Sequence, residues 1–66
     1  MTLSFNGEKR EFTAPLSVSE LLVALGYSTG AVAVALNGQF VPRSRHEATM
    51  LADGDQVDVV APMQGG

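Results

Sequence analysis

Apolar and small polar residues alternate at the start of the chain, where Leu3 and Phe5 are separated by Ser4. This period of two predicts a strand. Asn6-Gly7 comes next, and the pair predicts a tight hairpin because both residues tolerate positive φ. Residues 8–13 are rich in charge. We therefore expect them to form a second strand at the edge of a sheet.

The pattern changes after Pro15, where a helix is predicted. Ser17 and Glu20 have the spacing of a capping box, in which each side chain bonds the backbone N–H of the other residue. Gly26 is a typical helix stop, because glycine accepts the left-handed conformation at the C-terminal end. One face of this helix is apolar at a period near 3.6 and is formed by Val18, Leu21, Leu22 and Leu25.

Residues 31–36 form a continuous apolar run that ends in a second turn signal, Asn37-Gly38. The run is short and contains β-branched valines, so we interpret it as a strand buried on both faces and central in the sheet. Residues 39–41 are expected to return as a short strand that stops at Pro42.

The last third of the chain predicts a polar connection and one more strand. Residues 43–49 are polar, and Met50-Leu51 is expected to plug the core from a loop. Asp53-Gly54-Asp55 predicts a turn. Residues 56–60 then alternate, with Val57 and Val59 on one face. One helix of this length covers one face of a four- or five-stranded sheet, so the expected class is α+β.

Composition excludes several kinds of protein. The net charge is −3, and the four basic residues form two separate pairs, so nucleic-acid binding is not expected. The chain has no cysteine, which rules out a disulfide or a thiolate zinc site. No apolar run approaches the ~18 residues of a membrane span. The first residues lack the features of a signal peptide. We therefore expect a cytoplasmic protein without a membrane partner.

Candidate catalytic or metal-binding residues are few. His46 is the only histidine and lies in the polar connection, so we expect a solvated side chain. Asp53, Asp55 and Asp58 lack the rest of a calcium loop, and no metal site is predicted. No nucleophile with a neighbouring base is discernible. The sequence does not predict an enzyme.

An exposed apolar patch is the one surface feature that the pattern suggests. A single helix leaves the other face of the sheet open, and Phe40, Val41, Val60 and Met63 are candidates to contact partner proteins there. Ordinary packing is the simpler explanation for Phe40, and the two explanations are balanced for Val60. Met63 is the residue that we expect to contact partners.

Three segments resemble the sulfur carriers of thiamine thiazole synthesis. They are residues 34–44 (Val-Ala-Leu-Asn-Gly-Gln-Phe-Val-Pro-Arg-Ser), residues 51–57 (Leu-Ala-Asp-Gly-Asp-Gln-Val) and the terminal Gln64-Gly65-Gly66. The hairpin and the capped helix agree as well, so the resemblance covers the whole chain. It implies a ubiquitin-like β-grasp fold over residues 1–62, with a mixed sheet whose last strand pairs in parallel with the first, and a flexible tail over residues 63–66.

The resemblance also implies a function. An adenylating enzyme would activate the Gly66 carboxylate with ATP, and a cysteine desulfurase or sulfurtransferase would supply sulfur to form a thiocarboxylate. Thiazole synthase would then consume that sulfur. Gly65 and Gln64 would thread into the partner's site. The chain itself would bind no cofactor and would be a carrier, not an enzyme.

The residues support this chemistry independently. A terminal carboxylate is ionised at neutral pH and is a poor electrophile, so it needs activation. The chain lacks a phosphate-binding loop, so the activating site would be on a partner. Glycines without side chains let the backbone approach a nucleotide closely.

Two alternatives stay open. Pro62-Met63 is similar to the small subunit of molybdopterin synthase, which implies the same chemistry with another sulfur acceptor. The chain is also compatible with a non-covalent β-grasp interaction module whose tail takes no part in function.

A further departure from the sulfur-carrier family lies at Arg45-His46, where relatives commonly carry an acidic residue and an aromatic one.

Overall fold

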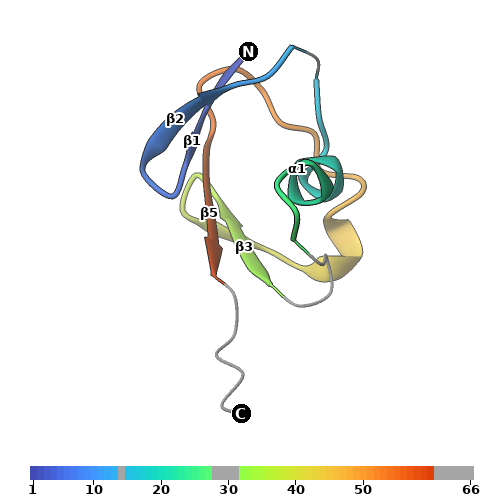
Figure 1. Cartoon of the computed structure of the whole chain (residues 1–66). Coiled ribbons are helices and arrows are strands. Elements are labelled where there is room, and N and C mark those ends of the chain that lie inside the picture. The colour runs from blue at the N-terminus through green and yellow to red at the C-terminus, as the bar shows by residue number, and fades with distance from the viewer. Residues whose placement is uncertain (14, 28–31, 61–66) are drawn as a thin grey trace.

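The computed structural model describes residues 1–13, 15–27 and 32–60, and these form one sheet with one helix packed on it. Figure 1 shows the helix α1 beside the sheet. The strands are β1 (Thr2–Phe5), β2 (Glu8–Glu11), β3 (Ala33–Leu36), β4 (Gln39–Val41) and β5 (Gln56–Val60). The helices are α1 (Val18–Ala24) and the 3₁₀-helix η2 (Arg43–Arg45).

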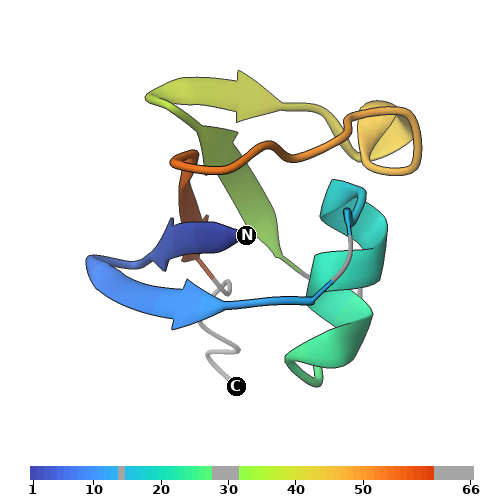
Figure 2. The same cartoon turned by 90° about the horizontal axis from the view of Figure 1, so that it is seen from above.

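The sheet has the order β2-β1-β5-β3-β4 and is mixed. β5 pairs in parallel with β1, and the other pairs are antiparallel. The expected parallel pairing of the first and last strands is therefore confirmed, as is the edge position of the charged strand β2. Figure 2 shows the two hairpins on either side of β5, with α1 facing the sheet from one side.

Both hairpins turn at the predicted Asn-Gly pairs. Asn6 and Gly7 have φ values of 49° and 86°, and Asn37 and Gly38 have φ values of 52° and 85°. Two consecutive residues with positive φ form the tight turn whose twist matches that of paired strands. The register of the first hairpin agrees with a two-residue turn, because Phe5 and Glu8, which flank Asn6-Gly7, are paired with each other.

The helix begins and ends as its sequence predicts. The Ser17 hydroxyl accepts from the Glu20 N–H at 3.0 Å, and the Glu20 carboxylate accepts from the Ser17 N–H at 2.8 Å. Gly26 has a φ of 84°. Its N–H bonds the Val23 carbonyl, and the next N–H, that of Tyr27, bonds the Leu22 carbonyl. This pair of bonds is the Schellman motif.

The core lies between α1 and one face of the sheet. Val57 and Val59 of β5 both point into it, as the alternation predicts. Its buried apolar residues are Leu3, Phe5, Val18, Leu21, Leu22, Val34, Val41, Leu51, Val57 and Val59.

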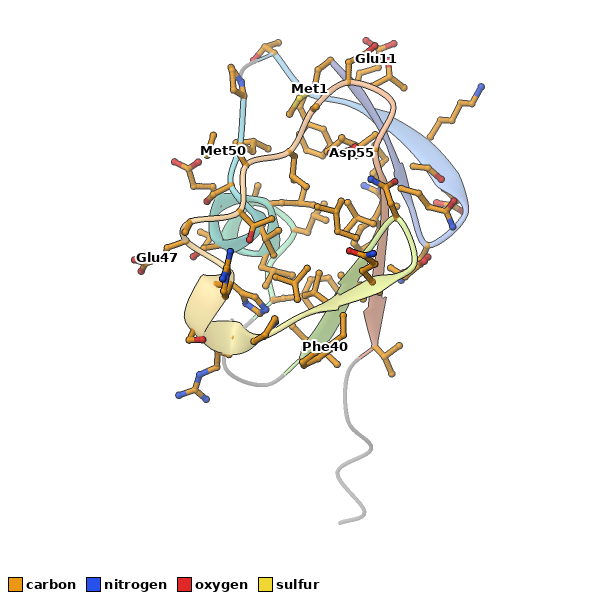
Figure 3. The ribbon with its side chains drawn as sticks, turned by 180° about the vertical axis from the view of Figure 1, so that it is seen from behind. Met1, Glu11, Phe40, Glu47, Met50 and Asp55 are labelled. Carbon is orange, nitrogen blue, oxygen red and sulfur yellow. The ribbon has the colours of Figure 1, made fainter. Side chains whose placement is uncertain are left out.

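Two expectations about burial were wrong. β3 is not buried on both faces, because only Val34 in it is buried and Ala33 is exposed. The single helix covers one face of β3, and nothing in the described residues covers the other. Leu51 plugs the core as predicted, but Met50 is 56% exposed. The backbone of Met50 instead bridges to Ser17, which turns its side chain outward (Figure 3).

Candidate functional site

The strand that leads to the predicted tail is β5, the middle strand of the sheet. It is paired along one edge with β1 and along the other with β3. Val60 is the last residue that the structure describes. The predicted sites at Met63, Gln64, Gly65 and Gly66 therefore lie outside the described residues, as does the predicted boundary between 62 and 63.

The Asn6 side chain holds the C-terminal half of β5. Its Oδ1 accepts from the Val59 N–H at 2.7 Å, and its Nδ2 donates to the Val59 carbonyl at 3.2 Å. The backbone N–H of Asn6 donates to the Val57 carbonyl at 2.9 Å. The first hairpin turn thus continues the β1–β5 pairing beyond the end of β1.

Asn37 of the second hairpin turn holds the other end of β5. Its Oδ1 accepts from the Gln56 N–H at 2.9 Å, and its backbone N–H donates to the Gln56 carbonyl at 2.7 Å. Its Nδ2 also donates to Asp55 Oδ1 at 3.1 Å. Sequence reasoning explained both asparagines by their turn conformation alone and missed these bonds, because their partners are far away in the sequence.

The open face of the sheet carries two exposed apolar side chains near the end of β5. Phe40 is 69% exposed and Val60 is 65% exposed. Phe40 pairs with Ala35, and Val60 pairs with Ala33 of the same strand. Paired residues share a face, and so do residues two apart along a strand, so all four side chains lie on the same face. The two alanines are small, and Phe40 and Val60 therefore stand out from the sheet.

The exposure of these residues tests the packing explanation that the sequence offered for them. Ordinary core packing, the simpler expectation for Phe40, was wrong, and Val60 is exposed as well. Val41 was a candidate for the same patch, but it is buried and points to the helix side. The alternation along β4 separates the two neighbours, because successive side chains point to opposite faces.

The expectation of a solvated His46 was wrong. Its side chain is 3% exposed. Nε2 lies 3.2 Å from the Val41 carbonyl oxygen, which can only accept, so Nε2 carries the hydrogen and donates. The predicted polar connection contains η2, and the turn after η2 directs the imidazole inward. The backbone carbonyl of His46 also accepts from the Ser19 N–H at 3.0 Å.

The acidic residues near the last turn bond the backbone. Asp53 Oδ1 accepts from the Thr2 N–H at 2.7 Å, and Asp55 Oδ2 accepts from the Ala52 N–H at 2.8 Å. Within residues 1–13, 15–27 and 32–60, no three His, Asp or Glu side chains come together as a metal site would require. No helix in the same residues is long and apolar enough to cross a membrane.

Comparisons with known proteins agree with the geometry of the sheet and the position of β5. The ThiS family model matches residues 3–66, which is nearly the whole chain. The chain belongs to the ThiS family. A crystal structure of the thiamine biosynthesis protein ThiS from Geobacter metallireducens superimposes with a TM-score of 0.85 at 38% identity, and each chain is covered completely. The ubiquitin-like β-grasp fold expected from the sequence is thereby confirmed.

Of two further relatives, one is as long as this chain and the other is much longer. The sulfur carrier protein ThiS of Escherichia coli is 33% identical over 66 residues, and the match covers both chains completely. A protein named thiazole synthase from Paramagnetospirillum magneticum is 41% identical over the same length, but the match covers 20% of it. The chain thus spans about a fifth of that relative. A segment of the ThiS family type occurs there within a longer protein.

Proposed function

We propose that this chain is a sulfur carrier of thiamine biosynthesis and that Gly66 bears the sulfur. In the proposed cycle, a partner enzyme transfers AMP from ATP to the Gly66 carboxylate and releases pyrophosphate. A persulfide on a cysteine desulfurase or sulfurtransferase then attacks the acyl-adenylate and displaces AMP, and a thiol reductant cleaves the resulting acyl disulfide to leave the thiocarboxylate. Thiazole synthase accepts that sulfur and returns the carboxylate. The chain is acted on by these enzymes and is not itself one.

The observation that carries the proposal is the ThiS family match, which runs to Gly66 and so includes the terminal Gly65-Gly66. The full-length likeness to a protein named as a sulfur carrier supports it. The names of the relatives refer to thiamine and thiazole, which favours thiazole synthase over molybdopterin synthase as the acceptor. Because the cycle consumes ATP, we propose that it takes place in the cytoplasm.

The described residues add physical support. β5 is bonded through Asn37 at its start and through Asn6 near its end, so its C-terminal half is held in a fixed position in the sheet. Phe40 and Val60 offer exposed apolar surface on the open face beside that point. We propose that partner enzymes contact these side chains while Met63, Gln64 and Gly65 thread toward their active sites.

The test is an intact-mass measurement after incubation with ATP, the adenylating enzyme and a sulfur donor from the same organism. We expect the mass to rise by the exchange of one oxygen for one sulfur. Two variants are the controls: deletion of Gly66, and an alanine added after Gly66. Neither should gain sulfur, because each changes the acyl group that must be activated.

Deletion of Gly66 is also expected to leave the urea midpoint unchanged, because the buried core residues identified above all lie between Leu3 and Val59. Unchanged mass of the wild-type chain, with an enzyme proven active on another carrier, would overturn the proposal. Full cellular function of the alanine-extended chain would instead support a non-covalent interaction module. Pull-down of thiazole synthase or of the large molybdopterin-synthase subunit separates the two sulfur acceptors.

A further inference from the structure

The two asparagines of the chain, Asn6 and Asn37, both precede glycine, and both lie in a tight hairpin turn with positive φ. Asparagine before glycine is especially prone to spontaneous deamidation, because glycine has no side chain to hinder attack by its own backbone nitrogen. Gly7 and Gly38 are both exposed, and no described atom lies within 4 Å of the place where a Cβ would stand on either. The dipeptide and the turn conformation therefore do not distinguish the two sites.

The reaction shows which contacts can distinguish them. The backbone nitrogen of the glycine attacks Cγ of the asparagine, the bond from Cγ to the side-chain nitrogen breaks, and that nitrogen leaves as ammonia with the proton of the glycine N–H. Water then opens the cyclic imide at one of its two carbonyls and gives aspartate or isoaspartate. Because Cγ must turn toward the glycine nitrogen, the hydrogen bonds of the asparagine side chain have to break first.

These hydrogen bonds differ between the two turns. Both side-chain atoms of Asn6 are bonded to the backbone of Val59, which is 6% exposed and lies in the middle strand. Release of Asn6 would leave two backbone groups of a buried residue without partners, which costs more than the bonds alone. The side chain of Asn37 is bonded to the Gln56 N–H and to the Asp55 carboxylate, and both bonds are exposed. Water can replace these partners, so Asn37 is released more easily.

We propose that Asn37 is a site of spontaneous deamidation in the folded chain and that Asn6 is protected from this reaction by its hydrogen bonds to Val59. The reaction consumes only water and leaves Gly66 untouched, so the proposal is independent of the sulfur-carrier chemistry. The product has a carboxylate in place of an amide and makes the net charge of −3 more negative by one.

The modification reverses the sign of one contact. Asn37 Nδ2 donates to Asp55 Oδ1 at 3.1 Å, and Asp55, which is labelled in Figure 3, also accepts from the Ala52 N–H through Oδ2. An aspartate at position 37 has an oxygen where Nδ2 was, so two carboxylates face each other and repel. The modification therefore weakens the contact between the second hairpin turn and the start of β5.

The experiment keeps the purified full chain in a mildly alkaline buffer and follows the exchange of one NH₂ group for one OH group by mass spectrometry. Trypsin releases the two asparagines in separate peptides, residues 1–9 and residues 11–43. In the folded chain, Asn37 should convert at least about tenfold faster than Asn6. A sample unfolded in guanidinium chloride is the control, and the two sites should convert there at similar rates.

Three results would overturn the proposal. One is conversion of Asn6 as fast as that of Asn37 in the folded chain. Another is an intact Asn37 in the folded chain over the time in which the unfolded control converts, because the turn would then protect both sites alike. The third is a difference between the sites that persists in the unfolded control, because neighbouring residues would then cause the selectivity.

Variants test the contact with Asp55. Asn37→Asp should raise the equilibrium constant of urea unfolding by about fivefold. Addition of Asp55→Asn should restore stability, because the new side-chain NH₂ can donate to the carboxylate at position 37 while its oxygen still accepts from the Ala52 N–H. Addition of Asp53→Asn is the matched control, since it makes the same change of charge but Asp53 bonds the Thr2 N–H. Equal recovery with both additions, or recovery with neither, would show that the modification does not act through Asp55.

Discussion

Replacement of Asn6 by glycine tests whether the first hairpin turn holds β5. Asn6 has a φ of 49°, a conformation that glycine adopts without strain. The turn should therefore persist in Asn6→Gly. What the variant loses is the pair of side-chain hydrogen bonds to the backbone N–H and carbonyl of Val59, at 2.7 and 3.2 Å.

The expected loss of stability follows from these two bonds. Each hydrogen bond contributes about 1 kcal/mol net, and a buried group left without a partner costs about 1–3 kcal/mol. Val59 is 6% exposed, so water reaches its N–H poorly. We expect the free energy of unfolding to fall by about 2 kcal/mol. In a domain of this size, that loss corresponds to a fall of about 8–16 °C in the melting temperature.

Urea unfolding followed by circular dichroism measures the loss, and hydrogen exchange by NMR locates it. Exchange of the Val59 N–H should become roughly thirty-fold faster, since each 1.4 kcal/mol is a factor of ten. Asn37→Gly is the control, because it makes the same substitution in the same kind of turn and its side-chain bonds are exposed. It should lose about 1 kcal/mol or less.

The reasoning is refuted if Asn6→Gly stays within about 0.5 kcal/mol of the wild type, the range of an ordinary surface substitution. It is also refuted if the Val59 N–H keeps its protection while overall stability falls. In that case Asn6 would act only through its turn conformation, and its hydrogen bonds to β5 would not contribute to stability.

Two further predictions concern the helix and the buried histidine. Ser17→Ala should lower the free energy of unfolding by about 1 kcal/mol, because it removes the N-terminal cap of α1. Ser19→Ala should lower it less, and equal losses for the two variants in urea unfolding would contradict the capping argument. His46→Ala should lower it by about 2–4 kcal/mol, because a cavity forms and the Val41 carbonyl loses its donor. Glu47→Ala, a substitution at the exposed neighbouring residue, should have almost no effect. Thermal unfolding of both variants measures the difference, and an unchanged melting temperature for His46→Ala would favour a solvated His46 side chain.

Several features of the molecule could be predicted from the sequence because they depend on neighbouring residues. The cap at Ser17, the glycine stop at Gly26 and the two Asn-Gly turns each involve bonds or backbone angles within a few residues. The alternation of Val57 and Val59 likewise predicted which face of β5 is buried. The family resemblance added the parallel pairing of β1 with β5, which no local pattern indicates.

The remaining features were decided by segments that meet only in the folded chain. Phe40 and Val41 are adjacent apolar residues, yet one is exposed and the other buried, because β4 lies at the edge of a sheet that has one helix on one face. His46 is polar and lies in a connection, yet η2 turns it against β4. Burial depends on what packs against a residue, and the local pattern around these residues does not contain that information.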